Sequence, residues 1–194
     1  GFLVVADVLR ASDGKRHTFD WMYHNLGDRI SSGAASQAND APEGQGFEYI
    51  EDVLRGESDA TIRATVFMDE ARVEVTVNGE PDSGVLVGTG VGESVIDRVP
   101  LIFVTRSGEE ARFAATIEPV AGDQTADIED VTFLDHKTSG YLIRILMRDG
   151  SEEVYAYDPE GAARNVEGIR TQSKLLCLRR ENAGDYHVLA EAGE

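Results

Sequence analysis

The chain has 194 residues, enough for one domain of ordinary size with its own hydrophobic core. Hydrophobic residues make up 41% of it, which excludes a disordered chain, and its apolar runs are far shorter than a bilayer span. The formal net charge of −18 argues against a nucleic-acid partner, because phosphate groups would be repelled. We therefore expect a globular protein with no nucleic acid and no membrane among its partners.

The first residues predict two strands and a turn. Residues 2–10 (FLVVADVLR) are apolar and typical of a strand already in progress, with no initiator methionine or signal peptide before it, so we interpret the chain as part of a longer protein. Residues 11–15 contain Asp13-Gly14 and predict a tight hairpin turn. Residues 16–25 (RHTFDWMYHN) predict a second strand, and we expect it to pair with the first.

Residues 27–46 are rich in Gly, Ser, Ala, Asn, Asp and Pro and predict a long surface loop. This loop follows the second strand directly, so it could cover whatever that strand presents.

From residue 47 the sequence predicts short strands separated by regular turn signals, with little helical periodicity. The expected strands are 47–54, 60–68, 72–77, 84–88, 99–106, 111–119, 127–135, 140–148, 152–157, 174–179 and 186–190. This pattern predicts an all-β fold, an antiparallel β-sandwich of two packed sheets with little helix, formed by residues 1–194 as a single domain.

Residues 16–25 hold the densest group of side chains capable of chemistry. On a strand, alternate side chains share a face. One face then carries an aromatic row headed by a histidine and the other a mostly polar row: His17, Phe19, Trp21 and Tyr23 against Thr18, Asp20, Met22 and His24. The aromatic row is open to two interpretations, a surface that stacks on sugars or side chains packed in the core.

Several motifs do not support a catalytic, metal or cofactor site. On a strand His17 faces away from Asp20 and His24, so the three do not converge on a zinc ion. No Lys-Ser/Thr pair follows Gly88–Gly92, which we interpret as a glycine-rich turn. Cys177, the only cysteine, lies in an apolar pattern and is interpreted as a buried hydrophobic side chain. We predict no catalytic residue, no metal and no cofactor.

Basic residues gather near the C-terminus, where only Glu167 opposes them: Arg164, Arg170, Lys174, Arg179 and Arg180. They form either a solvated face or a docking patch for an acidic partner, such as a polyanionic sugar or another domain. A polyuronate would be repelled by the net charge, so this local cluster is the candidate to hold one.

Two segments share patterns with a known family. Residues 2–25 run as an apolar strand ending Val-x-Asp-x-Leu-Arg, a polar turn, then His-Thr-Phe-Asp-Trp with His24 following. Residues 99–119 (VPLIFVTRSGEEARFAATIEP) add a Pro-hydrophobic strand, a basic turn and a Glu-Pro ending. Both resemble the C-terminal β-sandwich region of the heparinase II/III-like polysaccharide lyases, which include exolytic alginate lyases. Phe19 stands where the family motif has tyrosine.

The resemblance implies that this chain is the last domain of a larger lyase. In the family an N-terminal α/α toroid supplies the catalytic residues, and the cleft lies between the toroid and the sandwich. A His-x-His-type motif and often a zinc site lie upstream of the matching strand. The chain would thus support the substrate cleft of an enzyme that cleaves an acidic, uronic-acid-containing polysaccharide by β-elimination, in the periplasm or outside the cell. We expect the isolated chain to be inactive.

The predicted substrate-binding residues are His17, Trp21, His24 and Arg16, and the predicted partners are an acidic polysaccharide or oligosaccharide and the missing α/α domain. The alternative is a non-catalytic carbohydrate-binding or structural β-sandwich module, with Trp21 as the stacking platform. A third possibility is an acidic extracellular structural domain that binds no sugar.

Overall fold

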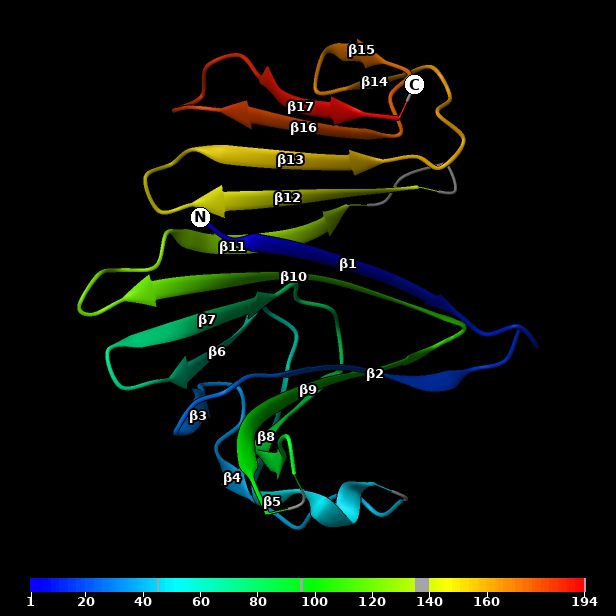
Figure 1. Ribbon diagram of the computed structural model, residues 1–194. Helices are drawn as coiled ribbons and strands as arrows, with labels where there is room; N and C mark the ends of the chain where they lie inside the picture. Colours follow the sequence, from blue (N-terminus) through cyan, green and yellow to red (C-terminus); the bar gives the residue numbers. More distant parts are fainter. Residues whose placement is uncertain (45, 95, 135–139, 194) are drawn as a thin grey trace. The chain divides into compact units, whose positions relative to one another are not determined.

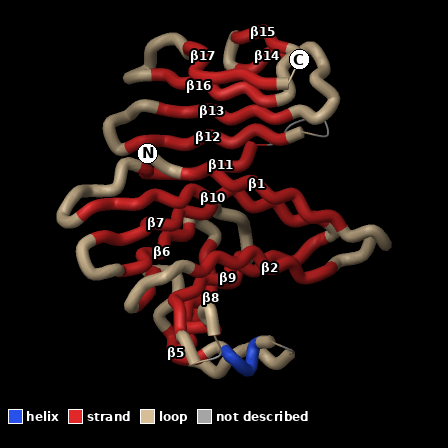
Figure 2. Tube along the Cα trace, viewed as in Figure 1, coloured by secondary structure: helices blue, strands red, loops and turns tan. Residues whose placement is uncertain are grey.

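The computed structural model describes residues 1–44, 46–94, 96–134 and 140–193 (Figure 1). It divides the chain into two compact units, an N-terminal unit of Gly1–Ala126 and a C-terminal unit of Asp127–Glu194. The fold is almost all β, as predicted, and the helix shown in Figure 2 is a single 3₁₀ turn, η1 (Phe47–Tyr49). Among the described residues no helix has the length and apolar character to cross a membrane. A single domain spanning both units stays a prediction.

The N-terminal unit is a sandwich of two antiparallel five-stranded sheets, which confirms the predicted architecture. Sheet A has the order β1-β10-β7-β6-β3, with bounds Leu3–Arg10, Glu110–Ala121, Ala71–Val77, Ile62–Phe67 and Arg29–Ser32. Sheet B has the order β2-β9-β8-β5-β4, with bounds His17–His24, Arg98–Gly108, Ser83–Val91, Glu51–Ser58 and Gln37–Ala38.

The core of this unit lies between the two sheets and draws on both. Alternate residues of β6 are buried, as the period of two requires of a strand with one face inward. Ile62, Val66 and Phe113 from sheet A are fully buried in one cluster with Ile102 and Val104 from sheet B. Burying apolar surface on both inner faces is the main stabilising contribution in such a fold.

The predicted pairing of the first two strands is wrong. β1 pairs along its whole length with β10, and β2 pairs with β9. β9 and β10 are joined through Glu109 but belong to different sheets, and Figure 1 shows the chain turning there. β1 and β2 follow the same corner beside them, so the Asp13-Gly14 turn connects two sheets rather than two partners in one ladder.

The predicted loop at residues 27–46 contains two strands, β3 and β4, which extend the edges of the two sheets. These strands were not predicted because they are only four and two residues long, which is too short to show the alternation of apolar and polar residues that is typical of a strand. Residues 39–44 and 46–50 lie outside these strands and include η1. The predicted glycine-rich turn at Gly88–Gly92 is also not a turn over most of its length, because its first four residues belong to β8. A Cβ on Gly88 would come 2.8 Å from the Glu51 carbonyl oxygen of β5.

The C-terminal unit is a five-stranded antiparallel sheet with a small hairpin packed on it. The sheet has the order β11-β12-β13-β16-β17, with bounds Ile128–Leu134, Tyr141–Met147, Glu152–Tyr157, Leu175–Arg180 and His187–Ala192. The hairpin β14-β15 (Arg164–Val166 and Ile169–Thr171) was not predicted from the sequence. Val166 and Ile169 of the hairpin pack against Leu176 and Leu178 of the sheet.

Candidate functional site

A polar groove of about 810 Å³ lies over the outer face of sheet B in the N-terminal unit, and we name it the outer groove. Trp21 of β2 points into the core. Because side chains alternate between the two faces of a strand, Thr18 and Asp20 point to the outer face, where they line the groove. The opposite wall is built by Asn39, Pro42 and Phe47, which belong to the connection before β5. The loop predicted at 27–46 therefore contributes Asn39 and Pro42 to the groove that Thr18 and Asp20 also line.

Strand register explains which side chains meet in the groove. One cross-strand row runs over all five strands of sheet B: Met22, Phe103, Leu86, Arg55 and Gln37. The next row runs over four strands: Asp20, Thr105, Gly84 and Glu57. Gly84 has no side chain, so the surface between Thr105 and Glu57 is hollow there. Except for Met22, every member of the two rows lines the groove.

The floor of the groove has an apolar part and a polar part. Phe47 of η1 lies against Phe103 with ring centroids 5.5 Å apart, and Phe103 packs on a small cluster of Val53, Leu86 and Leu101. The Thr105 hydroxyl donates a hydrogen bond to the Asp20 carboxylate, which fixes both side chains. Aromatic carbon beside carboxylate, amide and hydroxyl groups is a surface suited to a polyhydroxylated ligand.

Arg55 is the only cation among the residues that line the groove. Glu57 lies two residues away on the same strand and face, and Asp20 lines the opposite end of the second row. No ion pair of Arg55 is present within the described part of the chain, and its Nε and Nη2 atoms are buried without an acceptor there. The groove thus combines one cation with two carboxylates.

Trp21 is 8% exposed and sits in the core, where its ring is stacked beside Tyr23 with centroids 6.4 Å apart. The core interpretation of Trp21 is confirmed, and its indole offers little surface to a sugar. The aromatic side chains that line the outer groove are Phe47 and Phe103.

The other predicted binding residues do not line the outer groove. His17 is held at the turn by Asp13, whose carboxylate is 2.9 Å from His17 Nε2. This hydrogen bond holds the pKa of Asp13 below its ordinary value. Arg16 is exposed just before β2, and His24 is exposed at the far end of β2. The structure therefore does not gather Arg16, His17, Trp21 and His24 into one pocket, and their contact with substrate stays a prediction.

The basic residues near the C-terminus are largely neutralised by carboxylates. Arg180 lies 2.7 Å from Glu152, Arg179 3.3 Å from Glu153, and Arg164 3.6 Å from Asp158. Arg170 and Lys174 line a separate polar groove of about 670 Å³ together with Glu160 and Glu191. The residues named in the sequence as a basic cluster therefore do not form a uniformly positive patch.

A charged network within the described part of the C-terminal unit surrounds Glu152, which is 7% exposed. Its carboxylate accepts hydrogen bonds from Tyr186 and Arg180, and Arg144 Nε lies 2.7 Å from it. Arg144 also binds Glu167 in the turn of the β14-β15 hairpin, at 2.8 Å. Burial and the bond to Glu152 raise the pKa of Tyr186 to about 12. This network ties the hairpin to the sheet.

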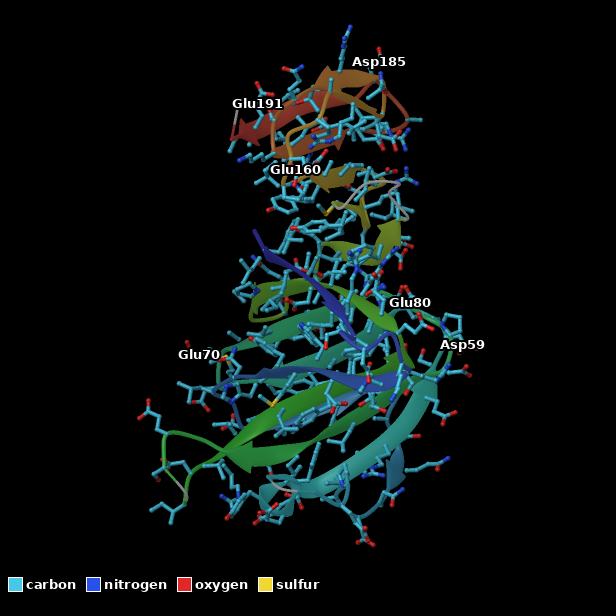
Figure 3. All side chains as sticks on the ribbon, turned by 90° about the vertical axis from the view of Figure 1, so that its right-hand side faces the viewer. Asp59, Glu70, Glu80, Glu160, Asp185 and Glu191 are labelled. Carbon is cyan, nitrogen blue, oxygen red and sulfur yellow. The ribbon has the colours of Figure 1, made fainter. Side chains whose placement is uncertain are left out.

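Acidic side chains are spread over the surface. Figure 3 shows Asp59 and Glu80 on one side of the N-terminal unit and Glu70 on the other. Within the described residues no three His, Cys, Asp or Glu side chains are placed to hold a metal ion.

The groove residues were missed in the sequence because they come from β2, β4, β5, β8 and β9, which meet only through non-local pairing. The strand expected at 47–54 stops one residue short of Arg55, whereas β5 continues through Arg55 and Glu57 to Ser58. Comparison with known proteins adds no identification, because the sequence matches no protein-family model and no curated protein significantly.

Proposed function

We propose that the N-terminal unit is a non-catalytic saccharide-binding β-sandwich and that the outer groove is its binding site. The observation that carries the proposal is the pair of side-chain rows on the outer face of sheet B, hollowed at Gly84 and walled by Phe47. Sugars present apolar C–H faces and hydroxyl edges. Phe47 and Phe103 suit the first, and Asp20, Glu57 and Gln37 suit the second.

The resemblance to the heparinase II/III-like lyases extends this proposal. The sandwich would be carried by a periplasmic or extracellular lyase that cleaves an acidic polysaccharide by β-elimination, and it would support substrate beside a catalytic domain outside this chain. The groove is consistent with a supporting role, since it contains no histidine or tyrosine that could exchange a proton with substrate.

Titration calorimetry with a panel of neutral and acidic oligosaccharides tests the proposal. We expect at least one member to bind, and Phe47→Ala to weaken its binding about tenfold by removing an aromatic contact of roughly 1.4 kcal/mol. Tyr49→Ala is the matched control, because Tyr49 lies in the same turn, is exposed and does not line the groove. Because Trp21 is buried, its fluorescence should not change on binding.

Three results would oppose the proposal. Absence of binding to every oligosaccharide would favour a purely structural domain. Equal loss of affinity in the Phe47 and Tyr49 variants would place the ligand elsewhere. Formation of unsaturated uronate by the isolated chain, seen as a rise in ultraviolet absorbance, would show that it is catalytic.

A further inference from the structure

We infer that the outer groove binds an internal stretch of a linear saccharide, about four sugar units long, which lies across the strands of sheet B and continues past both edges of the sheet. The inference rests on the proposed function, because it specifies the length and direction of the chain that the same groove holds.

The groove extends over the whole width of sheet B. Its lining residues come from all five strands, from β2 to β4, which are the two edge strands of the sheet. Neighbouring strands lie about 4.8 Å apart, so the four spacings from β2 to β4 give a length of roughly 19 Å. One unit of an extended 1,4-linked pyranose chain spans about 5 Å, close to one strand spacing. The groove therefore has room for about four units, one after another across the strands.

The wall of the groove runs beside this path and not across it. Asn39 comes directly after β4, and its backbone N–H donates a hydrogen bond of 3.1 Å to the Val53 carbonyl oxygen of β5. Phe47, later in the same connection, lies against Phe103 of β9, three strands away from β4. The connection thus passes over the same strands as the two side-chain rows and follows their direction.

The groove reaches the exposed edges of the sheet at both ends. The lining residues of the two edge strands, Thr18 and Asp20 on β2 and Gln37 on β4, are exposed. Leu86 on the central strand β8 is only 6% exposed, so the groove is shallower at its ends than in the middle. A site that recognises a chain terminus must enclose it, whereas shallow ends at the edges of a sheet leave room for a chain to continue.

The chemistry of the lining changes along this path. Phe47, Phe103 and Leu86 supply apolar surface over the middle strands, while Asp20 at one end and Gln37 at the other are polar. Sugar rings in the middle can stack on the aromatic side chains, and the hydroxyl groups of the outer units can bond the polar side chains. A chain of several units is needed to make both kinds of contact, so each unit added up to the sheet edges should add affinity.

Binding of saccharides of increasing length tests the inference. The probes are linear 1,4-linked oligomers of glucose and of galacturonic acid, each from one to six units long, and titration calorimetry measures their affinity. In at least one series we expect the affinity to rise at least about tenfold from dimer to tetramer and to change less than about twofold from tetramer to hexamer. Borohydride reduction of the terminal unit should leave the affinity of that hexamer unchanged, since an internal stretch needs no chain end.

Two variants at the sheet edges test where the chain lies. Asp20→Ala and Gln37→Ala should each weaken binding of the tetramer about fivefold by removing one hydrogen-bonding group. Neither should weaken binding of the dimer, because a dimer centred on Phe47 and Phe103 does not reach the edge strands. Gln124→Ala is the matched control, since it removes an exposed glutamine of the same unit outside the groove and should bind both oligomers like the wild type. Circular dichroism confirms that each variant is folded.

The possible failures of the inference and of the proposed function are distinguishable. A dimer that binds as tightly as the tetramer, or a hexamer that loses affinity when its terminal unit is reduced, would overturn the inference but not the saccharide site. The same conclusion would follow if both series failed while another oligosaccharide of the panel bound. Edge variants that weaken the dimer and the tetramer equally, or weaken neither, would overturn the path across the strands. Failure of the whole panel would overturn both the inference and the proposed function.

Discussion

The guanidinium of Arg106 lies over the ring of Phe113, with its Cζ atom 4.6 Å from the ring centroid, inside the N-terminal unit. Arg106 donates hydrogen bonds to the Ser83 hydroxyl, to the side chain and carbonyl of Asn78, and to the carbonyl of Arg112. Burial lowers the pKa of Arg106 to about 10, while Glu80 opposes this shift, so the group stays charged at neutral pH. The cation is thus held mainly by neutral oxygen atoms and an aromatic face.

Replacement of Arg106 by Met should lower the free energy of unfolding by about 2–4 kcal/mol, because several buried acceptors lose their donor together. Urea denaturation followed by the emission of Trp21, the only tryptophan, measures this change in the same unit. Arg16→Met, at an exposed position, should change stability by less than about 0.5 kcal/mol. Equal stabilities of the two variants would contradict the structural role of Arg106.

Gly56→Ala should destabilise the N-terminal unit by about 3 kcal/mol and disturb the outer groove. A Cβ at this position would lie 1.9 Å from the Ala34 carbonyl oxygen, so the segment before β4 would have to move away from β5. Gly33→Ala is the matched control, because a Cβ there meets no atom within 4 Å. The prediction is wrong if both alanine variants unfold at the same urea concentration.

The stability of the C-terminal unit should fall in acid because of Glu152. Burial raises the pKa of this carboxyl, but the hydrogen bonds from Tyr186 and Arg180 and the charge of Arg144 outweigh burial and leave the pKa below its ordinary value. A carboxyl with a lowered folded-state pKa adds stability above its unfolded-state pKa, near 4.5, and loses it as the pH falls through the folded-state value. Near-ultraviolet circular dichroism of the tyrosines follows the transition.

Glu152→Gln should lower stability at pH 7 by about 1–2 kcal/mol, since it leaves the partly exposed guanidinium groups of Arg144 and Arg180 without their charge partner. Its stability should then depend less on pH below 5 than that of the wild-type protein. Glu181→Gln should behave like the wild type, because Glu181 is exposed and lies 3.6 Å from Arg179. If the stability of the Glu152→Gln variant falls in acid as much as that of the wild type, other carboxyl groups cause the pH dependence.

Cys177 should be slow to react with iodoacetamide at pH 8. It is 8% exposed, and burial raises the pKa of its thiol against the opposing hydrogen bond with Tyr155, so little thiolate is present and little can be reached. We expect alkylation at least about tenfold slower than that of glutathione, and rapid alkylation in denaturant. Mass spectrometry measures the alkylated fraction of the protein over time. Alkylation of the native protein as fast as that of glutathione would contradict the prediction and show that the strand of Cys177 opens readily.

Much of the scaffold could be predicted because burial in a sandwich alternates along each strand. The segment around Ile62–Phe67 alternates in the sequence and in burial, and most longer strands were placed within a few residues. Alternation of apolar and polar residues cannot identify β3, β4, β14 and β15, because these strands have only two to four residues each. The predicted pairing of β1 with β2 was also wrong, because a short turn with Asp13-Gly14 can connect strands of two different sheets as well as two adjacent strands of one sheet.

The candidate site was less predictable than the scaffold. Residues 16–25 were chosen for their chemistry, yet only Thr18 and Asp20 of that stretch line the outer groove. The row Phe103, Leu86, Arg55 and Gln37 spans four strands and has no signature in any one of them. Its order depends on the bulge that shifts the register between Glu51 and Leu54, and that shift cannot be read from composition.

The pairing of β1 with β10 also bears on how the chain folds. Arg10 and Glu110 meet across this ladder although 100 positions separate them in the sequence. Contacts between such distant segments close large loops and slow folding. During synthesis β1 emerges well before β10 and lacks this partner until β10 has left the ribosome, so its exposed edge is a place where a nascent chain can aggregate or recruit a chaperone.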